Sequence, residues 1–185
     1  MRNAEINGKH MVLEGFKNVK IKNLQTLFVS PKNQAKNYCV QLFDSNLVAG
    51  FDHVYFAALN ALKAFEEGRN ISKDLAVEIL LYASGQHQIS KAIQLLGIKP
   101  GSREVAVLVL SETHEKALEA LDKVSQQLQG KQCDGIIDMT KRKTHKIKFS
   151  FNIKDTEVKA VMRESEEQAV TSLLIERAAL LATHL

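Results

Sequence analysis

Residues 78–98, EILLYASGQHQISKAIQLLGI, carry two helical patterns separated by a short polar break. Gly85 follows the first pattern, where a helix end favours a residue that tolerates the left-handed conformation. The sequence therefore predicts two helices joined by a polar elbow, residues 84–88. Over residues 72–83 the positions spaced for a buried helix face are Leu75, Ala76, Ile79, Leu80 and Ala83. The helical spacing then resumes with Ile89, Ala92, Ile93 and Leu96, and stops at Gly97.

The elbow carries four side chains that form hydrogen bonds, Ser84, Gln86, His87 and Gln88. One interpretation is a corner between helices, in which these side chains satisfy backbone groups left unpaired at the helix ends. The other is a binding site, because donors at the start of a helix suit a phosphate or a sugar. Lys91, one turn further on, would add positive charge to such a site. The pattern alone favours neither interpretation.

The composition is that of a globular protein and indicates one domain over residues 1–185, with 45% hydrophobic and 25% charged residues. A net charge of +4 is compatible with an acidic partner but does not require one. Cys39 and Cys133 lie far apart without a CxxC spacing, which predicts two reduced thiols. The first ten residues lack an apolar signal core, and no run reaches the roughly 18 apolar residues of a membrane span. We therefore expect a cytoplasmic protein with no membrane partner.

The remaining patterns predict an α+β fold, a single domain with a mostly antiparallel mixed sheet packed with four to five helices. Strands are expected over residues 11–17, 38–43, 104–110 and 146–154, with 38–43 in a central position. Further helices are expected over 51–67, 113–128, and from a capping box at 165–168 almost to the C-terminus. Asn70 or Ser72 is expected to cap the helix before the elbow. Residues 20–36 are ambiguous, with Leu24, Leu27 and Phe28 as the expected buried positions.

Residues 146–154 alternate between apolar and polar side chains, with Ile147, Phe149, Phe151 and Ile153 on the apolar side. This period of two predicts a half-exposed antiparallel strand. The basic run at 141–146, continued by Lys148, would contact nucleic-acid phosphates or would discourage pairing at the sheet edge. The strand pattern places no aromatic residue on the polar face to stack against bases, so the second interpretation is favoured.

Motifs that would indicate catalysis are missing from the sequence. It contains no GxxxxGK[ST], GxGxxG, HExxH or GxSxG motif, and its histidines and cysteines have no metal-ligand spacing. Ser84 has no neighbouring base in the sequence to activate it, which argues against a nucleophile. We therefore predict a binding protein with no catalytic residue, metal, cofactor or small-molecule substrate. The alternative is an enzyme whose site is assembled from distant residues, with His87 as its base.

The elbow and its flanking helices resemble the small regulatory subunit of the KEOPS complex, a family that in eukaryotes includes the PRPK-binding protein. The likeness is strongest to archaeal members and covers most of the chain. It includes residues 40–48, the helix after Phe51, the strand at 105–110, and Ile175 to Ala178 near the C-terminus. The sequence departs from the archaeal pattern at His87, where relatives usually have arginine. A histidine is largely neutral near pH 7, which weakens any contact with phosphate.

This resemblance implies a non-catalytic subunit of the machinery that installs threonylcarbamoyladenosine in tRNA. Such subunits bind the kinase-like ATPase of the complex, and archaeal members also bind the 3′ CCA end of tRNA. The RNA-binding candidates are Ser84, Gly85, Gln86, His87, Gln88 and Lys91. The kinase-contact candidates are Ile89, Ile93, Leu96 and Ile98. Two alternatives stay open. In one, the chain is an activator of the kinase that acts only through protein contacts, independently of RNA. In the other, Ile93, Leu96 and Ile98 belong to the core.

Overall fold

The structure is a computed structural model that describes residues 1–21 and 38–183. These residues form five strands and seven α-helices, so the α+β class predicted from the sequence is confirmed. The predicted number of helices, four to five, was too low. The expected buried positions Leu24, Leu27 and Phe28 lie outside the described residues.

The sheet is built around β4 (Glu104–Ser111), which pairs antiparallel with β2 (Lys9–Lys17) and with β3 (Tyr38–Asp44). On the far side of β2 lie β1 (Arg2–Ile6) and, further along the same edge, the short β5 (Lys131–Gln132). All of these pairings are antiparallel. Among the described strands β3 pairs only with β4, so it lies at an edge of the sheet and the predicted central position was wrong.

Strand β4 is buried on both faces, which explains its uninterrupted apolar run. Alternate side chains point to opposite faces of a strand and therefore enter two different cores. Val105, Val107 and Val109 join the core beneath α5 (His114–Leu128). Ala106, Leu108 and Leu110 join the larger core on the other face of the sheet.

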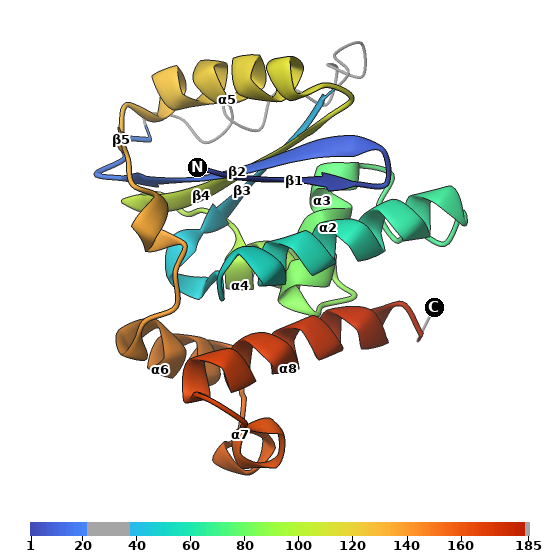
Figure 1. Ribbon diagram of the computed structural model, residues 1–185, viewed down its shortest axis with the longest axis vertical. Helices are drawn as coiled ribbons and strands as arrows, with labels where there is room; N and C mark the ends of the chain where they lie inside the picture. The colour runs from blue at the N-terminus through green and yellow to red at the C-terminus, as the bar shows by residue number, and fades with distance from the viewer. Residues whose placement is uncertain (22–37, 184–185) are drawn as a thin grey trace.

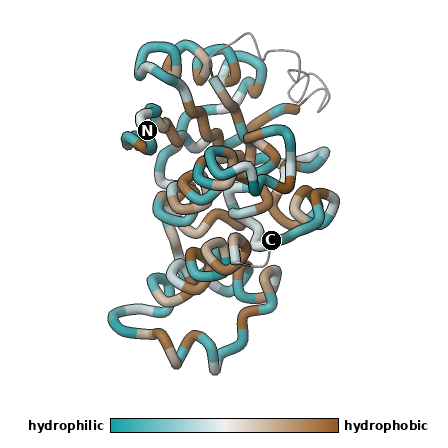
Figure 2. Tube along the Cα trace, turned by 90° about the vertical axis from the view of Figure 1, so that its right-hand side faces the viewer, coloured by the Kyte–Doolittle hydropathy of each residue, from teal (hydrophilic) through white to brown (hydrophobic). Residues whose placement is uncertain are grey.

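The helices lie in unequal layers on the two faces of the sheet, with α5 covering one face (Figure 1). Helices α2 and α3 cover the other face, with α4 packed against α3. Helix α8 packs across α2 and α3 and also contacts α6 and α7. Figure 2 shows hydrophobic and hydrophilic positions alternating along the helices, as expected for helices that bury one side. Their bounds are α2 Phe51–Glu66, α3 Leu75–Ser84, α4 Ile89–Leu96, α6 Lys141–Ser150, α7 Asp155–Val161 and α8 Glu166–Leu181.

Helix α6 occupies most of the region predicted as a strand over residues 146–154, so that prediction was wrong. The hydroxyl of Thr140 caps the helix by accepting the N–H of Lys143 at 3.3 Å. Ile147 and Phe151 are both buried, and their spacing of four fits one face of a helix as well as one face of a strand. Phe149 lies between them and is 90% exposed, which only the helical period explains.

Helix α3 begins later than predicted and has a different cap. The carboxylate of Asp74 accepts the N–H groups of Ala76 and Val77, so Asp74 caps the helix instead of Asn70 or Ser72. At the other end of the α2–α3 connection, Gly68 adopts a positive φ of 66° just after α2, as expected for a helix C-terminus.

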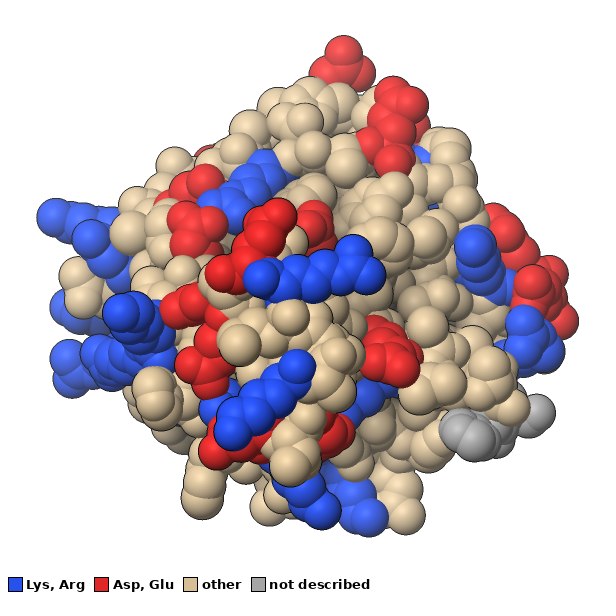
Figure 3. Space-filling model, turned by 60° about the horizontal axis from the view of Figure 1, so that its bottom comes forward, with Lys and Arg blue, Asp and Glu red and all other residues tan. Residues whose placement is uncertain are grey.

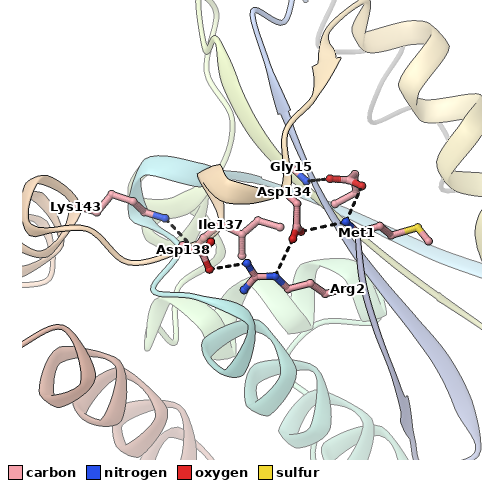
Figure 4. A network of polar contacts seen from close by, with 8 residues as sticks. Met1, Arg2, Gly15, Asp134, Ile137, Asp138 and Lys143 are labelled. Atoms are coloured by element: carbon pink, nitrogen blue, oxygen red, sulfur yellow. Dashed lines mark hydrogen bonds and ion pairs between the residues drawn. The ribbon is translucent and has the colours of Figure 1, made fainter. Parts of the chain in front are cut away.

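A polar network fixes the segment that leads into α6 to the edge of the sheet (Figure 4). The guanidinium of Arg2 pairs with the carboxylates of Asp134, at 3.3 Å, and Asp138, at 2.5 Å. Buried Lys143 donates from Nζ to two backbone carbonyls of the same segment, at 2.9 and 3.1 Å. Burial lowers the pKa of Lys143 to about 8. This network sets where α6 starts and therefore which of its faces meets solvent.

Candidate functional site

The backbone of the elbow follows a standard helix ending, as the sequence predicted for Gly85. Its φ is 61°, in the left-handed region. The N–H of Gly85 donates to the carbonyl of Tyr82, and the N–H of Gln86 donates to that of Leu81, both at 3.1 Å. A Cβ at position 85 would lie 3.6 Å from Cβ of Arg177, an ordinary contact. The backbone angle, and not a lack of space, is what favours glycine here.

Buried His53 connects the end of α3 to the start of α2. Its Nδ1 accepts the N–H of Ala49 at 3.1 Å, which leaves the proton on Nε2 for the carbonyl of Ala83 at 2.7 Å. Burial lowers the pKa of His53 to about 4, so the ring is neutral at physiological pH. Sequence reasoning did not select His53, although it precedes Ala57 by four residues and so lies on the buried side of α2.

Glu78 is a second buried polar residue with a structural role. Its side chain is fully buried, and its carboxylate accepts the N–H of Ile71 at 3.0 Å and that of Ser72 at 2.7 Å. Two charge-assisted hydrogen bonds offset the cost of burying the carboxylate. Glu78 therefore ties down the connection before α3 and does not reach the surface of the elbow.

The RNA-binding candidates fall into a buried and an exposed group. Ser84 is 2% exposed, and its hydroxyl donates to the carbonyl of Leu81 at 3.0 Å. Gln86 is half-buried, whereas His87, Gln88 and Lys91 are exposed. Within the described part of the chain no hydrogen bond joins Ser84 to His87, and the hydroxyl of Ser84 already donates to Leu81. The elbow therefore offers polar groups for binding, and no pair of nucleophile and base.

The kinase-contact candidates also divide in two. Ile89 is 41% exposed and Ile93 is 46% exposed, and their spacing of four places them side by side on α4. Leu96, which is fully buried, and Ile98, which is 4% exposed, belong to the two cores. The prediction that these two residues belong to a contact surface was wrong, because a buried side chain cannot meet a partner. The exposed apolar surface of α4 thus consists of Ile89 and Ile93.

A hollow of about 400 Å³ lies on another side of α4. Its walls come from η2 (Ser45–Leu47), from the elbow and α4, and from the end of α6. Lys91 is two residues from both Ile89 and Ile93, so it points away from the apolar pair. The lining residues are Leu47, Gln86, Lys91, Gln94, Leu95, Lys99 and Ser150.

The electrostatics of this side of α4 suit an anionic group. The first turn of α4 has no acidic side chain, and the side chain of Gln88 forms no capping hydrogen bond. The N-cap side chain therefore satisfies none of the first N–H groups, at the positive end of the helix. Lys91 and Lys99 add two cations to the wall of the hollow.

The segment at 175–178 lies against the elbow although it is far away in sequence. The guanidinium of Arg177 donates to the carbonyl of Phe151 at 2.6 Å and pairs with Glu157 at 3.0 Å. If residue 85 had a Cβ atom, the atom nearest to it would be Cβ of Arg177. Two stretches that carried the family likeness are thus neighbours in space.

Neither a metal site nor a membrane span was found in the described part of the chain. No group of three or more His, Cys, Asp or Glu residues within 1–21 and 38–183 could hold a metal ion. No helix there combines the length and the apolar character needed to cross a bilayer.

Comparison with known proteins agrees with the resemblance seen in the sequence. Residues 16–182 match the family described as kinase binding protein CGI-121. The chain is 38% identical over 61 residues to the KEOPS complex subunit Cgi121 of Pyrococcus abyssi, a match that spans 33% of this chain and 36% of the relative. It is 29% identical over 114 residues to the regulatory protein Cgi121 of Methanocaldococcus jannaschii, spanning 62% of this chain and 70% of the relative. The chain belongs to the kinase-binding CGI-121 family.

Proposed function

We propose that the chain is a non-catalytic, cytoplasmic subunit of the KEOPS complex that supports threonylcarbamoyladenosine modification of tRNA. In this role it binds the kinase-like ATPase subunit through Ile89 and Ile93, and the 3′ CCA end of tRNA through the elbow and Lys91. Family membership supports the kinase partner, and the name of the Pyrococcus relative supports the complex. The observation that carries the proposal is the exposed isoleucine pair beside a polar, cationic hollow.

The isoleucine pair suits a protein partner because it is apolar and already ordered by α4. Burying an aliphatic side chain of this size contributes roughly 1.5–3 kcal/mol relative to full exposure. Ile89 and Ile93 are only partly exposed, so burying what remains of both supplies about 1–3 kcal/mol. Polar residues of the elbow border the pair and provide a rim that contributes specificity.

The kinase contact is tested by Ile93→Glu, followed by co-purification with the kinase-like subunit of the same organism. A carboxylate at the centre of the contact should abolish binding, because it would be buried without a partner. The melting temperature should stay the same, since Ile93 is 46% exposed. Met162→Glu is the matched control, because Met162 is 51% exposed at the end of a different helix. Retained binding by Ile93→Glu contradicts the contact, and unfolding assigns Ile93 to the core.

The RNA contact is tested with His87→Ala combined with Lys91→Ala, using intact tRNA and tRNA trimmed of its CCA end. The double variant should bind intact tRNA more weakly, and trimming should remove most of the difference between variant and wild type. If trimming changes nothing in the wild-type protein, the CCA contact is wrong. In that case the alternative is favoured, an activator of the kinase that needs no RNA. The burial of Ser84 and the absence of arginine at position 87 point the same way.

A further inference from the structure

The solvent-facing side of α6 combines basic residues with an exposed aromatic ring. Residues three or four apart share a helix face. On α6 this spacing brings Phe149 between His145 and Lys146, with Arg142 two turns earlier on the same side. The exposed residues of this basic face are Lys141, Arg142, His145, Lys146 and Phe149. The opposite side, with Lys143, Thr144 and Ile147, is buried.

Phe149 contributes nothing to the core of the described chain. Its side chain is 90% exposed, far more than the next exposed large hydrophobic residue, Met162, at 51%. Phe149 lies in the last turn of α6, and phenylalanine also has a lower helix propensity than leucine or lysine. Local stability therefore gives no reason for an aromatic residue here, and a ring that is open on all sides is free to stack on a flat ligand.

The charges of the basic face are likewise not explained by local stability. The first turn of α6 contains Lys141 and Arg142 and no acidic residue, although the helix dipole favours the opposite sign there. Within the described residues Lys141, Arg142 and Lys146 form no ion pair. Lys148, on the flank of the helix, is different, because it pairs with Asp155 at 2.6 Å and with Glu166 at 2.5 Å. The positive charge of the basic face is therefore uncompensated.

The end of α6 also forms part of the hollow beside α4. Ser150, which follows Phe149, lines the hollow together with Lys91 and Lys99. The basic face and the hollow are thus adjacent, and both present cations. In Figure 3, Lys and Arg side chains gather at the left edge of the molecule, the side on which α6 lies in Figure 1.

We infer that the basic face of α6 binds single-stranded RNA, with phosphates on Lys141, Arg142 and Lys146 and a base stacked on Phe149. Uncompensated cations that track a backbone, interleaved with an aromatic ring, are the combination that single-strand binding uses. An acidic peptide would match the charge but would leave the ring unused. The inference rests on the proposed function only in taking RNA as the ligand, since this face lies outside the elbow.

The test measures binding of the full chain to a fluorescein-labelled oligoadenylate of about 12 nucleotides, a length within the range of single-strand sites. Phe149→Ala should weaken binding about tenfold, whereas Phe149→Tyr, which keeps the ring, should bind like wild type. Replacing Lys141, Arg142 and Lys146 together by glutamine should lower the slope of log affinity against log salt by about 2, because each phosphate contact contributes about 0.7. The matched control is Lys116→Gln with Lys123→Gln, two exposed lysines of α5.

Unchanged affinity in the α6 variants overturns the inference, as does equal weakening by the α5 control. Binding of wild type to phosphatidylserine vesicles or to polyglutamate, but not to oligoadenylate, overturns it in favour of another anionic surface. The elbow is tested separately with tRNA. The α6 variants should weaken intact and trimmed tRNA alike, whereas the effect of the elbow variant should depend on the CCA end. Either proposal can therefore fail while the other stands.

Discussion

Helices α4 and α6 are both short, carry positive charge and expose apolar side chains. They differ in where the apolar side chains lie relative to the cations. On α4 the exposed apolar residues are two aliphatic side chains, Ile89 and Ile93, and the cation Lys91 points to another side. On α6 a single aromatic ring, Phe149, lies among the cations. An aliphatic pair separated from charge suits the apolar centre of a protein interface. A ring surrounded by positive charge suits a base and its phosphates.

Removing the support that His53 gives to the end of α3 and to the residue after α6 should have the largest effect. His53 bonds to the end of α3, and its ring packs edge-on against Phe151 just after α6, with centroids 6.3 Å apart. His53→Ala leaves the groups of Ala49 and Ala83 unpaired and opens a cavity, so it should lower the free energy of unfolding by about 4 kcal/mol. Chemical denaturation measures this. His53→Asn can restore one hydrogen bond and should recover part of the lost stability. If His53→Ala is as stable as wild type, His53 does not stabilise this region.

Acid should weaken the same support without a mutation. The folded-state pKa of His53 is lowered to about 4, so the unfolded chain, with a pKa near 6.5, binds more protons between these values. Stability should therefore be fully present above about pH 6.5 and fall as the pH drops toward 4, by about 3 kcal/mol in total. Denaturation curves at several pH values measure the slope, and His53→Asn serves as the reference. If the stability of wild type and of His53→Asn depends equally on pH, groups other than His53 cause the dependence.

A pair of substitutions on α6 should sharpen the contrast between its two sides. Ile147→Ala removes a fully buried side chain and should cost about 3 kcal/mol. Phe149→Ala, only two residues away, should change stability by less than about 0.5 kcal/mol, because the ring is 90% exposed. Thermal melts of both variants give the comparison. Equal losses of stability at the two positions would mean that Ile147 and Phe149 share one buried face, as in the strand predicted from the sequence. That result would contradict the helix.

The elbow could be predicted from the sequence because its signals are local. Gly85 marks a left-handed residue at a helix end, and the spacing on either side fits only helices. Helix α6 could not be predicted in the same way, because Ile147 and Phe151 are spaced for a strand face and a helix face alike. The deciding residue, Phe149, looks like a core residue unless its surroundings are known.

The exposure of the candidate residues was predicted only in part, and the failures have a common cause. Leu96 and Ile98 are apolar like Ile89 and Ile93, and only tertiary packing shows that they are buried. His53 lies on the expected buried stripe of α2, but its two partners come from residues 49 and 83, which a linear pattern does not pair. Periodicity identifies which positions of an element are equivalent, and long-range contacts decide which of them reach solvent.

The separation of ligands around α4 has a consequence for the geometry of an assembly. A helix of eight residues is about 12 Å long and, with its side chains, about 10 Å across. A kinase surface seated on Ile89 and Ile93 and an RNA strand seated beside Lys91 would therefore be held about one helix diameter apart. With both ligands bound as proposed, α4 would act as a rigid spacer that fixes the register between the ATPase and the end of its RNA.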